Sequence, residues 1–185
     1  MNFTEKKCLI AYYSRKGNNY AGGSIINLPT GNMEVVAKII HENTGGKLFH
    51  IDTLRAYPAD YNETTEVAQR ENRENARPEL TGKVEKMDSY DVIFLGYPNW
   101  WSTMPMVVFI FLESYDFSGK IIIPFCTHEG SGLGSSEKDI AKLCPKAILF
   151  SVLAIQGSYV NASRQDVENW SNQIKIKQII DIKVD

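Results

Sequence analysis

The sequence predicts an α/β fold in which a five-stranded parallel sheet is covered by helices on both faces. Two observations support this prediction. Five short apolar runs are almost uninterrupted by polar residues, which is typical of strands buried on both faces. Segments with helical periodicity separate the runs, and a helical crossover lets each strand return parallel to its neighbour. We expect residues 1–185 to form a single domain, because a chain of 185 residues can bury one such core.

The predicted strands are compact apolar runs bounded by charged or turn-forming residues. The first, KCLIAYY, is followed by Ser14, and the third, DVIFLGYP, ends at Pro98. The other runs have the same character. The five strands are expected at 7–13, 47–54, 91–98, 120–128 and 146–155.

The predicted helices carry apolar residues three and four positions apart. Gly45-Gly46 stands at the expected C-cap of the first helix, and Pro78 ends the second, which is polar and rich in charge. The third follows Pro105; its apolar sequence alone fits strand or helix, but its length and the preceding proline favour a helix. The helices are expected at 32–44, about 63–76, 106–116, 136–144 and 163–176.

Composition excludes several kinds of partner. The net charge of −2 and the pI near 6.0 give no basic surface for nucleic acid. The apolar run near the N-terminus is too short for a signal peptide, and no stretch is long enough to span a membrane. Cys8, Cys126 and Cys144 are far apart and lack C-x-x-C spacing, which predicts reduced core thiols in the cytoplasm and no metal site.

Ligands of such sheets bind at the carboxyl ends of the strands, beside the point where the strand order reverses. The loops after the first, third and fourth strands are therefore the candidate site. The first loop reaches a helix start at Thr30-Gly31-Asn32-Met33. The free N–H groups and partial positive charge of a helix N-terminus favour a phosphate, which Ser14 can also reach. The earlier Gly17-Asn18 turn has no helix after it, so we do not expect it to bind an anion.

The other two loops add aromatic rings and hydrogen-bonding groups. GYPNWWSTMP (96–105) carries two adjacent tryptophans, and such rings in a polar loop stack on a flat ligand or pack beneath a neighbour. CTHEGSGLGSS (126–136) is rich in glycine and hydroxyl groups. Because the three loops meet at one edge, we expect a ligand with a flat aromatic head and a phosphate tail. Cys126, at the same edge, is expected to be a buried structural thiol rather than a redox group.

Three motifs, YYS…TGNM, GYPNWWSTMPM and PFCTHEGSGLGSS, resemble those of the flavodoxin family, in particular its bacterial flavodoxin-like oxidoreductase branch. The resemblance covers nearly the whole chain. It implies a three-layer αβα sandwich with strand order 2-1-3-4-5 and FMN as the cofactor. Trp100 is the preferred residue for stacking on the flavin ring. The cofactor-binding residues that the resemblance implies are Ser14, Arg15, Thr30, Gly31, Asn32, Met33, Pro98, Asn99, Trp100, Trp101, Thr127, His128, Glu129, Gly130 and Gly132.

The chain departs from the family in its first loop. The family usually joins the hydroxyl residue to the T-G-N motif within a few positions, whereas here residues 15–29 separate Ser14 from Thr30. We interpret 15–29 as an inserted flap that covers the flavin, binds a substrate or only decorates the surface. The flap brings three larger polar side chains to the mouth of the expected site: Arg15, Lys16 and Tyr20.

Further departures concern the chemistry. Many electron-carrying flavodoxins have a glycine after the stacking aromatic residue, and its peptide can turn over to stabilise the one-electron-reduced flavin. Here Trp101 takes that place, without the permissive backbone of glycine, and His128 and Glu129 replace an aromatic residue in the third loop. The chain is also less acidic than those carriers. These features favour an enzyme that reduces a small acceptor such as a quinone by two electrons, with NAD(P)H as a candidate donor.

Two of these side chains have expected roles at the flavin. A protonated His128 would stabilise the reduced, anionic flavin, which would make it the candidate catalytic residue. The carboxylate of Glu129 would oppose that anion, so we expect it to point away from the ring.

Two other functions remain open: a one-electron shuttle that docks on a larger reductase, and a cofactor-free binding module. The electron donor, the acceptor and the choice between monomer and homodimer are also open. Three other classes lack their residues. A phosphoacceptor domain needs clustered aspartates, a zinc peptidase needs a second histidine where Gly132 stands, and a serine hydrolase needs G-x-S-x-G.

Overall fold

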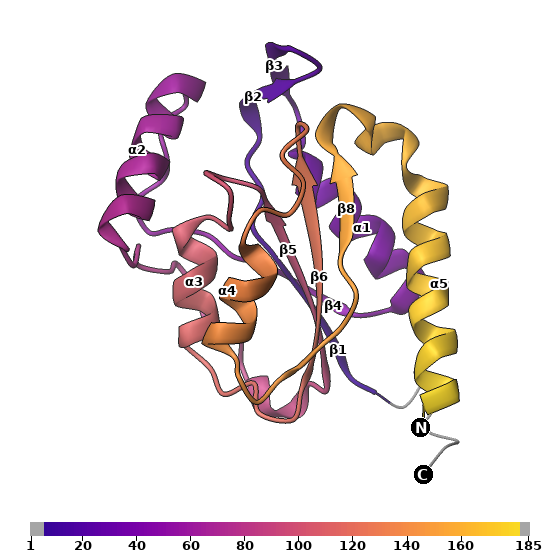
Figure 1. Ribbon diagram of the computed structural model, residues 1–185. Helices are drawn as coiled ribbons and strands as arrows, with labels where there is room; N and C mark the ends of the chain where they lie inside the picture. Colours follow the sequence, from indigo (N-terminus) through magenta and orange to yellow (C-terminus); the bar gives the residue numbers. More distant parts are fainter. Residues whose placement is uncertain (1–5, 182–185) are drawn as a thin grey trace.

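The computed structural model describes residues 6–181 and has a central parallel sheet between two layers of helices (Figure 1). The strand order is β4-β1-β5-β6-β7, and β8 also pairs with β6. In terms of the five predicted runs this is 2-1-3-4-5, so the predicted fold class is confirmed. The strands of this sheet are β1 (Cys8–Tyr12), β4 (Lys47–His50), β5 (Val92–Pro98), β6 (Ile121–His128), β7 (Ile148–Leu149) and β8 (Leu153–Gln156).

The prediction of one continuous fifth strand is wrong, because the run forms the two short strands β7 and β8. Ile122 of β6 pairs with Leu149, and Phe125 pairs with Leu153, so two residues of β6 face three residues of the other segment. Pro124 lies in this gap, and proline has no N–H group to donate to a neighbouring strand. The extra residue bulges at the point where the ladder is interrupted.

The helices cover both faces of the sheet (Figure 1). One layer contains α1 and α5, which contact each other, and the opposite layer contains α3 and α4 with α2 at its edge. Helix α2 begins two residues earlier than predicted, because the Asp60 side chain caps it by accepting a hydrogen bond from the N–H of Glu63. The helices are α1 (Asn32–Thr44), α2 (Tyr61–Glu74), α3 (Met106–Glu113), α4 (Ser136–Leu143) and α5 (Arg164–Asp181), with short 3₁₀ turns η2 (Met87–Ser89) and η3 (Gly157–Ala162).

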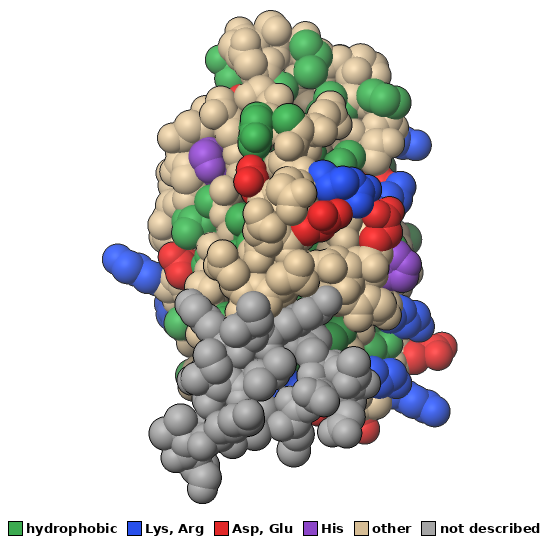
Figure 2. Space-filling view, turned by 90° about the vertical axis from the view of Figure 1, so that its right-hand side faces the viewer, with side chains coloured by type: hydrophobic (Ala, Val, Ile, Leu, Met, Phe, Trp, Pro, Cys, Tyr) green, Lys and Arg blue, Asp and Glu red, His purple; other side chains and the backbone are tan. Residues whose placement is uncertain are grey.

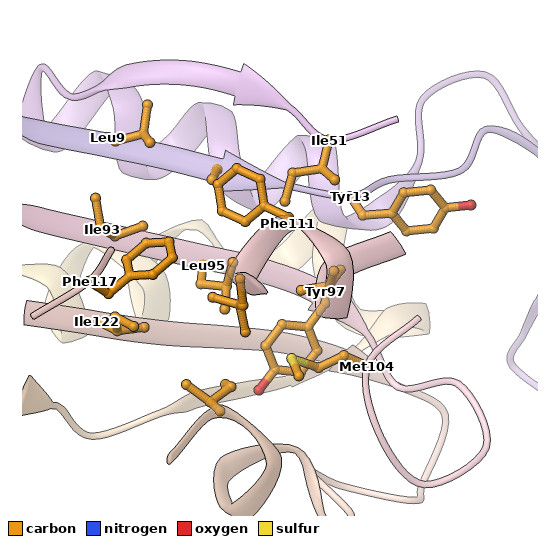
Figure 3. Packing of buried hydrophobic residues seen from close by; sticks show 14 of the residues in the cluster. Leu9, Tyr13, Ile51, Ile93, Leu95, Tyr97, Met104, Phe111, Phe117 and Ile122 are labelled. Carbon is orange, nitrogen blue, oxygen red and sulfur yellow. The ribbon is translucent and has the colours of Figure 1, made fainter. Parts of the chain in front are cut away.

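Successive residues of the central strands point to opposite faces of the sheet and build two hydrophobic clusters. On β1, Leu9 and Ala11 belong to one cluster, whereas Cys8 and Ile10 belong to the other. Figure 3 shows the first cluster, in which Phe111 of α3 lies over the side chains of the strands. Both alternating sets are buried, which explains why the strands are uninterrupted apolar runs in the sequence.

The inserted segment folds as a β-hairpin. Strands β2 (Gly17–Ala21) and β3 (Ser24–Leu28) are antiparallel and form a separate two-stranded sheet. Gly22 and Gly23 join them with φ angles of 60° and 89°, the left-handed pair that suits a two-residue hairpin turn. In Figure 1 the hairpin lies beyond the carboxyl ends of the parallel strands. The Gly17-Asn18 turn that resembled a phosphate loop is thus part of a strand.

The outer face made by α1 and α5 carries basic and acidic side chains close together in its described part (Figure 2). Arg164 of α5 bonds to Glu42 of α1 at 2.9 Å and to Glu168 at 3.2 Å. Such exposed pairs contribute little to stability, and the mixture of signs gives this face no strong field for a charged partner. Among the described residues, no helix is both long and apolar enough to cross a membrane.

Two thiols illustrate how the core controls reactivity. Burial raises the pKa of Cys126 to about 12 and that of Cys144 to about 11. At pH 8 a thiol of pKa 12 is ionised to only about one part in 10⁴, and the thiolate is the reactive form.

We therefore expect neither Cys126 nor Cys144 to react with iodoacetamide in the folded protein at pH 8. Peptide mass spectrometry after a one-hour incubation should find both thiols unmodified, whereas the protein in guanidinium chloride should be labelled at both. Rapid labelling of Cys126 in the native protein would contradict a purely structural role for this thiol.

Candidate functional site

A cavity of about 240 Å³ lies at the carboxyl ends of β1, β5 and β6, where the three predicted loops meet. Ten of the predicted site residues line it: Ser14, Arg15, Asn32, Met33, Pro98, Asn99, Trp100, Thr127, His128 and Glu129. Five others do not line this cavity and instead shape the loops around it: Thr30, Gly31, Trp101, Gly130 and Gly132.

One end of the cavity is the N-terminus of α1. Gly31 is the N-cap residue, and the Ser14 hydroxyl accepts a hydrogen bond from the N–H of Glu34 at 3.0 Å. The N–H groups of Asn32 and Met33 find no acceptor among the described residues, as expected for the first turn of a helix. A Cβ atom on Gly31 would overlap Ser14 Oγ and lie 2.6 Å from the carbonyl oxygen of Arg15. This tight cradle fits a phosphate group, as predicted from the T-G-N sequence.

Arg15 fastens the base of the hairpin. Its guanidinium donates to the carbonyl oxygens of Pro58 and Ala59, both at 2.7 Å, and to that of Asn18. Half-burial lowers the pKa of Arg15 because it removes water from the charged group. The residue therefore adds positive charge to the cavity wall while most of its donors hold backbone carbonyls in place.

Trp100 presents its half-buried indole to the cavity. The centroid of the ring lies 5.4 Å from that of Tyr13, with an angle of 82° between the ring planes. For Tyr57 the centroid distance is 5.2 Å and the interplanar angle is 89°. Two edge-to-face contacts fix the orientation of the indole ring. Its assignment as the stacking residue remains a prediction, and the rigid mounting is consistent with it.

The turn that follows Trp100 is unusual. The N–H of Trp100 donates to the carbonyl of Thr103 at 2.8 Å, and the N–H of Thr103 donates to the carbonyl of Trp100 at 3.2 Å. Between them, Trp101 and Ser102 have φ angles of 52° and 66°, in the left-handed region that favours glycine. The turn thus adopts a glycine-like backbone without glycine. Trp101 is 48% exposed, and its indole N–H donates to the carbonyl of Thr65 in α2 at 3.0 Å.

The third loop holds this turn from the other side. The carbonyl of Ser102 accepts from the N–H of Ser135 at 2.7 Å, and Asn99 Nδ2 donates to the carbonyl of Gly132 at 2.6 Å. A Cβ atom on Gly134 would overlap the Ser102 carbonyl oxygen and lie 2.5 Å from its carbon. The second and third loops therefore form one hydrogen-bonded unit.

The His128 ring is oriented by its own loop. Its Nδ1 accepts a hydrogen bond from the N–H of Gly130 at 3.0 Å. A neutral ring that accepts at Nδ1 carries its proton on Nε2, which has no partner among the described residues. In this form His128 can donate a hydrogen bond from Nε2. The role of a protonated His128 at the flavin stays a prediction.

Glu129 links the hairpin to the body of the protein. One carboxylate oxygen accepts from the N–H of Gly22 at the hairpin turn, at 3.2 Å, and the other accepts from the N–H of Ser158 at 2.6 Å. Gly157 leaves room for this carboxylate, since a Cβ atom there would lie 2.6 Å from Glu129 Oε1. Although Glu129 lines the cavity, its carboxylate is bonded to two backbone donors, one in the inserted hairpin and one in the segment after β8.

Sequence reasoning missed part of the cavity wall. Asn19 and Tyr20 come from the hairpin, Tyr61 from the start of α2, Ser131 from the third loop and Gly157 from the segment after β8. Of these five residues, Tyr20 was expected at the mouth of the site from the sequence, and the other four were missed. Tyr61 gave no signal, because nothing local shows that the start of α2 approaches the hairpin.

Comparison with known proteins supports the fold and its family. A family model described as Flavodoxin matches residues 7–174. A putative flavoprotein from Bacteroides uniformis ATCC 8492 is 27% identical, with a TM-score of 0.68 over 89% of this chain and 97% of that one. A putative flavoprotein from Bacteroides eggerthii DSM 20697 is 26% identical, with a TM-score of 0.66 over 88% and 98%.

A more distant structure, a flavoprotein in complex with FMN from Lactobacillus acidophilus NCFM, shares the fold. It is 20% identical, with a TM-score of 0.61 over 85% of this chain and 97% of that one. A comparison with curated proteins gives no match.

The close contact between Gly134 and the Ser102 carbonyl leads to a prediction about the stability of the fold. Gly134→Ala should lower the free energy of unfolding by about 2 kcal/mol, because the new methyl group overlaps a carbonyl and Gly134 has a φ of 57°. Urea unfolding followed by circular dichroism measures this. Gly82→Ala is the matched control, since nothing lies within 4 Å of its Cβ position. Equal stability of the two variants would mean that the second and third loops are not packed as described.

The Glu129 contacts predict the mobility of the hairpin. In Glu129→Gln one of the two backbone donors loses its acceptor, and charge-assisted bonds of this kind contribute about 1.5–3 kcal/mol. Amide hydrogen exchange at Gly22 and Ser158 should become at least tenfold faster, while exchange in β5 stays unchanged. Glu137→Gln, on exposed α4, serves as the control. Unchanged exchange at both amides would show that Glu129 does not hold the hairpin.

Proposed function

Since the chain belongs to the flavodoxin family, we propose that it is an FMN-dependent redox protein that reduces a small acceptor. The observation that carries this proposal is the continuous cavity between the N-terminus of α1 and the space beside Trp100 and His128. One end suits a phosphate and the other suits a flat ring.

The residues present divide the binding of FMN between its two ends. The N–H groups of Asn32 and Met33, with the Ser14 hydroxyl, would hold the phosphate. Trp100 and the Nε2–H of His128 would face the flavin ring. Bound FMN supplies the chemistry, which is the reversible uptake of one or two electrons. The protein orients the ring and limits the access of water to it.

The second loop supports two-electron reduction rather than one-electron transport. The carbonyl of Trp101 accepts from Asn72 Nδ2 at 3.3 Å, and the N–H of Ser102 donates to Asn99 Oδ1 at 3.1 Å. The peptide between Trp101 and Ser102 is therefore bonded at both ends. It occupies the place of the peptide that turns over in electron-carrying relatives, and the same movement here would break both bonds. The modest net charge of −2 also suits a small-molecule acceptor better than electrostatic docking on a protein.

The proposal includes the reaction partners and the compartment. NAD(P)H is the proposed donor and a quinone the proposed type of acceptor. A protein reductase as donor, with the chain acting as a shuttle, is the second candidate. Cys126 and Cys144 are buried and form no disulfide among the described residues, which suits the reducing cytoplasm. The chain would act as a monomer or homodimer without nucleic acid.

The test is an anaerobic stepwise reduction of the FMN-loaded protein, followed by its absorption spectrum. Direct bleaching, and bleaching by NAD(P)H alone, is the expected result. Accumulation of the blue or red one-electron-reduced flavin would favour the shuttle. Failure of FMN to bind at all would overturn both forms of the proposal and leave a binding module.

The phosphate cradle gives a sharper prediction. Gly31→Ala should weaken FMN binding at least tenfold, because its methyl group displaces Ser14 and the Arg15 carbonyl. Quenching of FMN fluorescence measures the affinity, and Gly82→Ala is again the control. Riboflavin, which lacks the phosphate, should lose less affinity than FMN in the Gly31 variant. An equal loss for both ligands would mean that the phosphate does not bind at the α1 N-terminus.

A further inference from the structure

A second cavity of about 340 Å³ adjoins the proposed FMN cavity. Five residues border both cavities: Arg15, Asn19, Tyr61, Asn99 and Trp100. The remaining wall of the second cavity comes from α2 and the unusual turn: Thr64, Thr65, Ala68 and Trp101. A molecule bound here would therefore lie directly beside a ring held next to Trp100.

The lining of this cavity is less polar than its residue names indicate, because most of its donors are already used. Both hydrogen bonds donated by Asn19 Nδ2 end on backbone carbonyls, and the Trp101 indole N–H is bonded to Thr65 O. The hydroxyl groups of Thr64 and Thr65 also donate to backbone carbonyls, as do three N–H groups of Arg15 and one of Asn99. No carboxylate lines the cavity. Two indole rings and the Ala68 methyl group are left as its main surface.

Tyr61 is the exception. Its hydroxyl has no hydrogen-bond partner among the described residues. Its half-buried ring stacks on Tyr20, with 6.2 Å between the ring centroids and 29° between the ring planes. Burial raises the pKa of Tyr61, so the hydroxyl keeps its proton and can donate a hydrogen bond to an acceptor. The cavity thus combines a flat apolar space with a hydroxyl group that is free to donate a hydrogen bond.

We propose that this second cavity binds the electron acceptor, a flat and uncharged aromatic carbonyl compound whose oxygen accepts a hydrogen bond from Tyr61 Oη. A two-ring quinone has this chemistry: its faces pack on the tryptophans and its carbonyl meets the donor. Arg15 is the one cation among the lining residues, and three of its N–H groups bond to backbone carbonyls. A carbonyl oxygen, which carries a partial negative charge, suits this wall. The inference rests on the proposed function, because it places the acceptor next to the proposed flavin.

The experiment measures binding of 2-methyl-1,4-naphthoquinone to the oxidised, FMN-loaded protein by equilibrium dialysis. Ala68→Leu, which fills only the second cavity, should weaken naphthoquinone binding at least tenfold and leave FMN affinity within twofold. Tyr61→Phe should reduce the preference for the naphthoquinone over 2-methylnaphthalene, which lacks carbonyls, by about three- to tenfold, the usual effect of one hydrogen bond. Tyr159→Phe is the matched control, because Tyr159 is 51% exposed and lines neither cavity.

The outcomes separate this inference from the proposed function. Normal FMN binding with naphthoquinone affinity unchanged in Ala68→Leu would overturn the second cavity as the acceptor site alone. An unchanged ligand preference in Tyr61→Phe would overturn the role of the hydroxyl. Loss of FMN binding in the wild-type protein would overturn the proposed function, and the acceptor role with it. Circular dichroism of each variant confirms that it is folded.

Discussion

The site depends on the parallel register of β1, β5 and β6. Tyr12, the last residue of β1, is paired with Gly96, and Gly96 with Phe125. The strands β5 and β6 end only two and three residues later, so the three loops leave the sheet at one edge. Close contact at this level requires glycine, since a Cβ atom on Gly96 would lie 2.8 Å from the sulfur of Met33 and would overlap the Phe125 ring. Met33 belongs to the first turn of α1. The same packing that closes the core therefore sets the distance between the phosphate end of the cavity and its aromatic end.

Much of this arrangement could be predicted from the sequence, because it follows from local patterns. Uninterrupted apolar runs indicate strands buried on both faces, and the strand ends then identify the three loops. The break in the last strand was missed, since Pro124 stands in a neighbouring strand and acts through its absent N–H. The left-handed Trp101 was also missed. The turn is held by residues far away in the chain: Trp101 donates to the carbonyl of Thr65 and accepts from Asn72, and Ser102 accepts from Ser135.

Roles of single side chains were harder to predict than their positions. Glu129 lies at the cavity as expected, but its carboxylate is used to join the hairpin to the segment after β8. His128 also lies there, and the bond from the N–H of Gly130 to its Nδ1 fixes the orientation of the ring. In both cases a backbone N–H decides the role of the side chain. Such donors cannot be seen in a sequence, because every residue except proline carries one.

The inserted hairpin changes what this edge of the sheet can do. In a sheet without it, the cavity would be open above the first loop, whereas here Asn19 and Tyr20 form a wall opposite the second and third loops. Tyr20 also stacks on Tyr61, which connects the hairpin to α2 and closes the space between them. The second cavity exists because of this connection. The insertion has thus added a second compartment beside the cavity at the edge of the sheet, and this compartment is the proposed site of the acceptor.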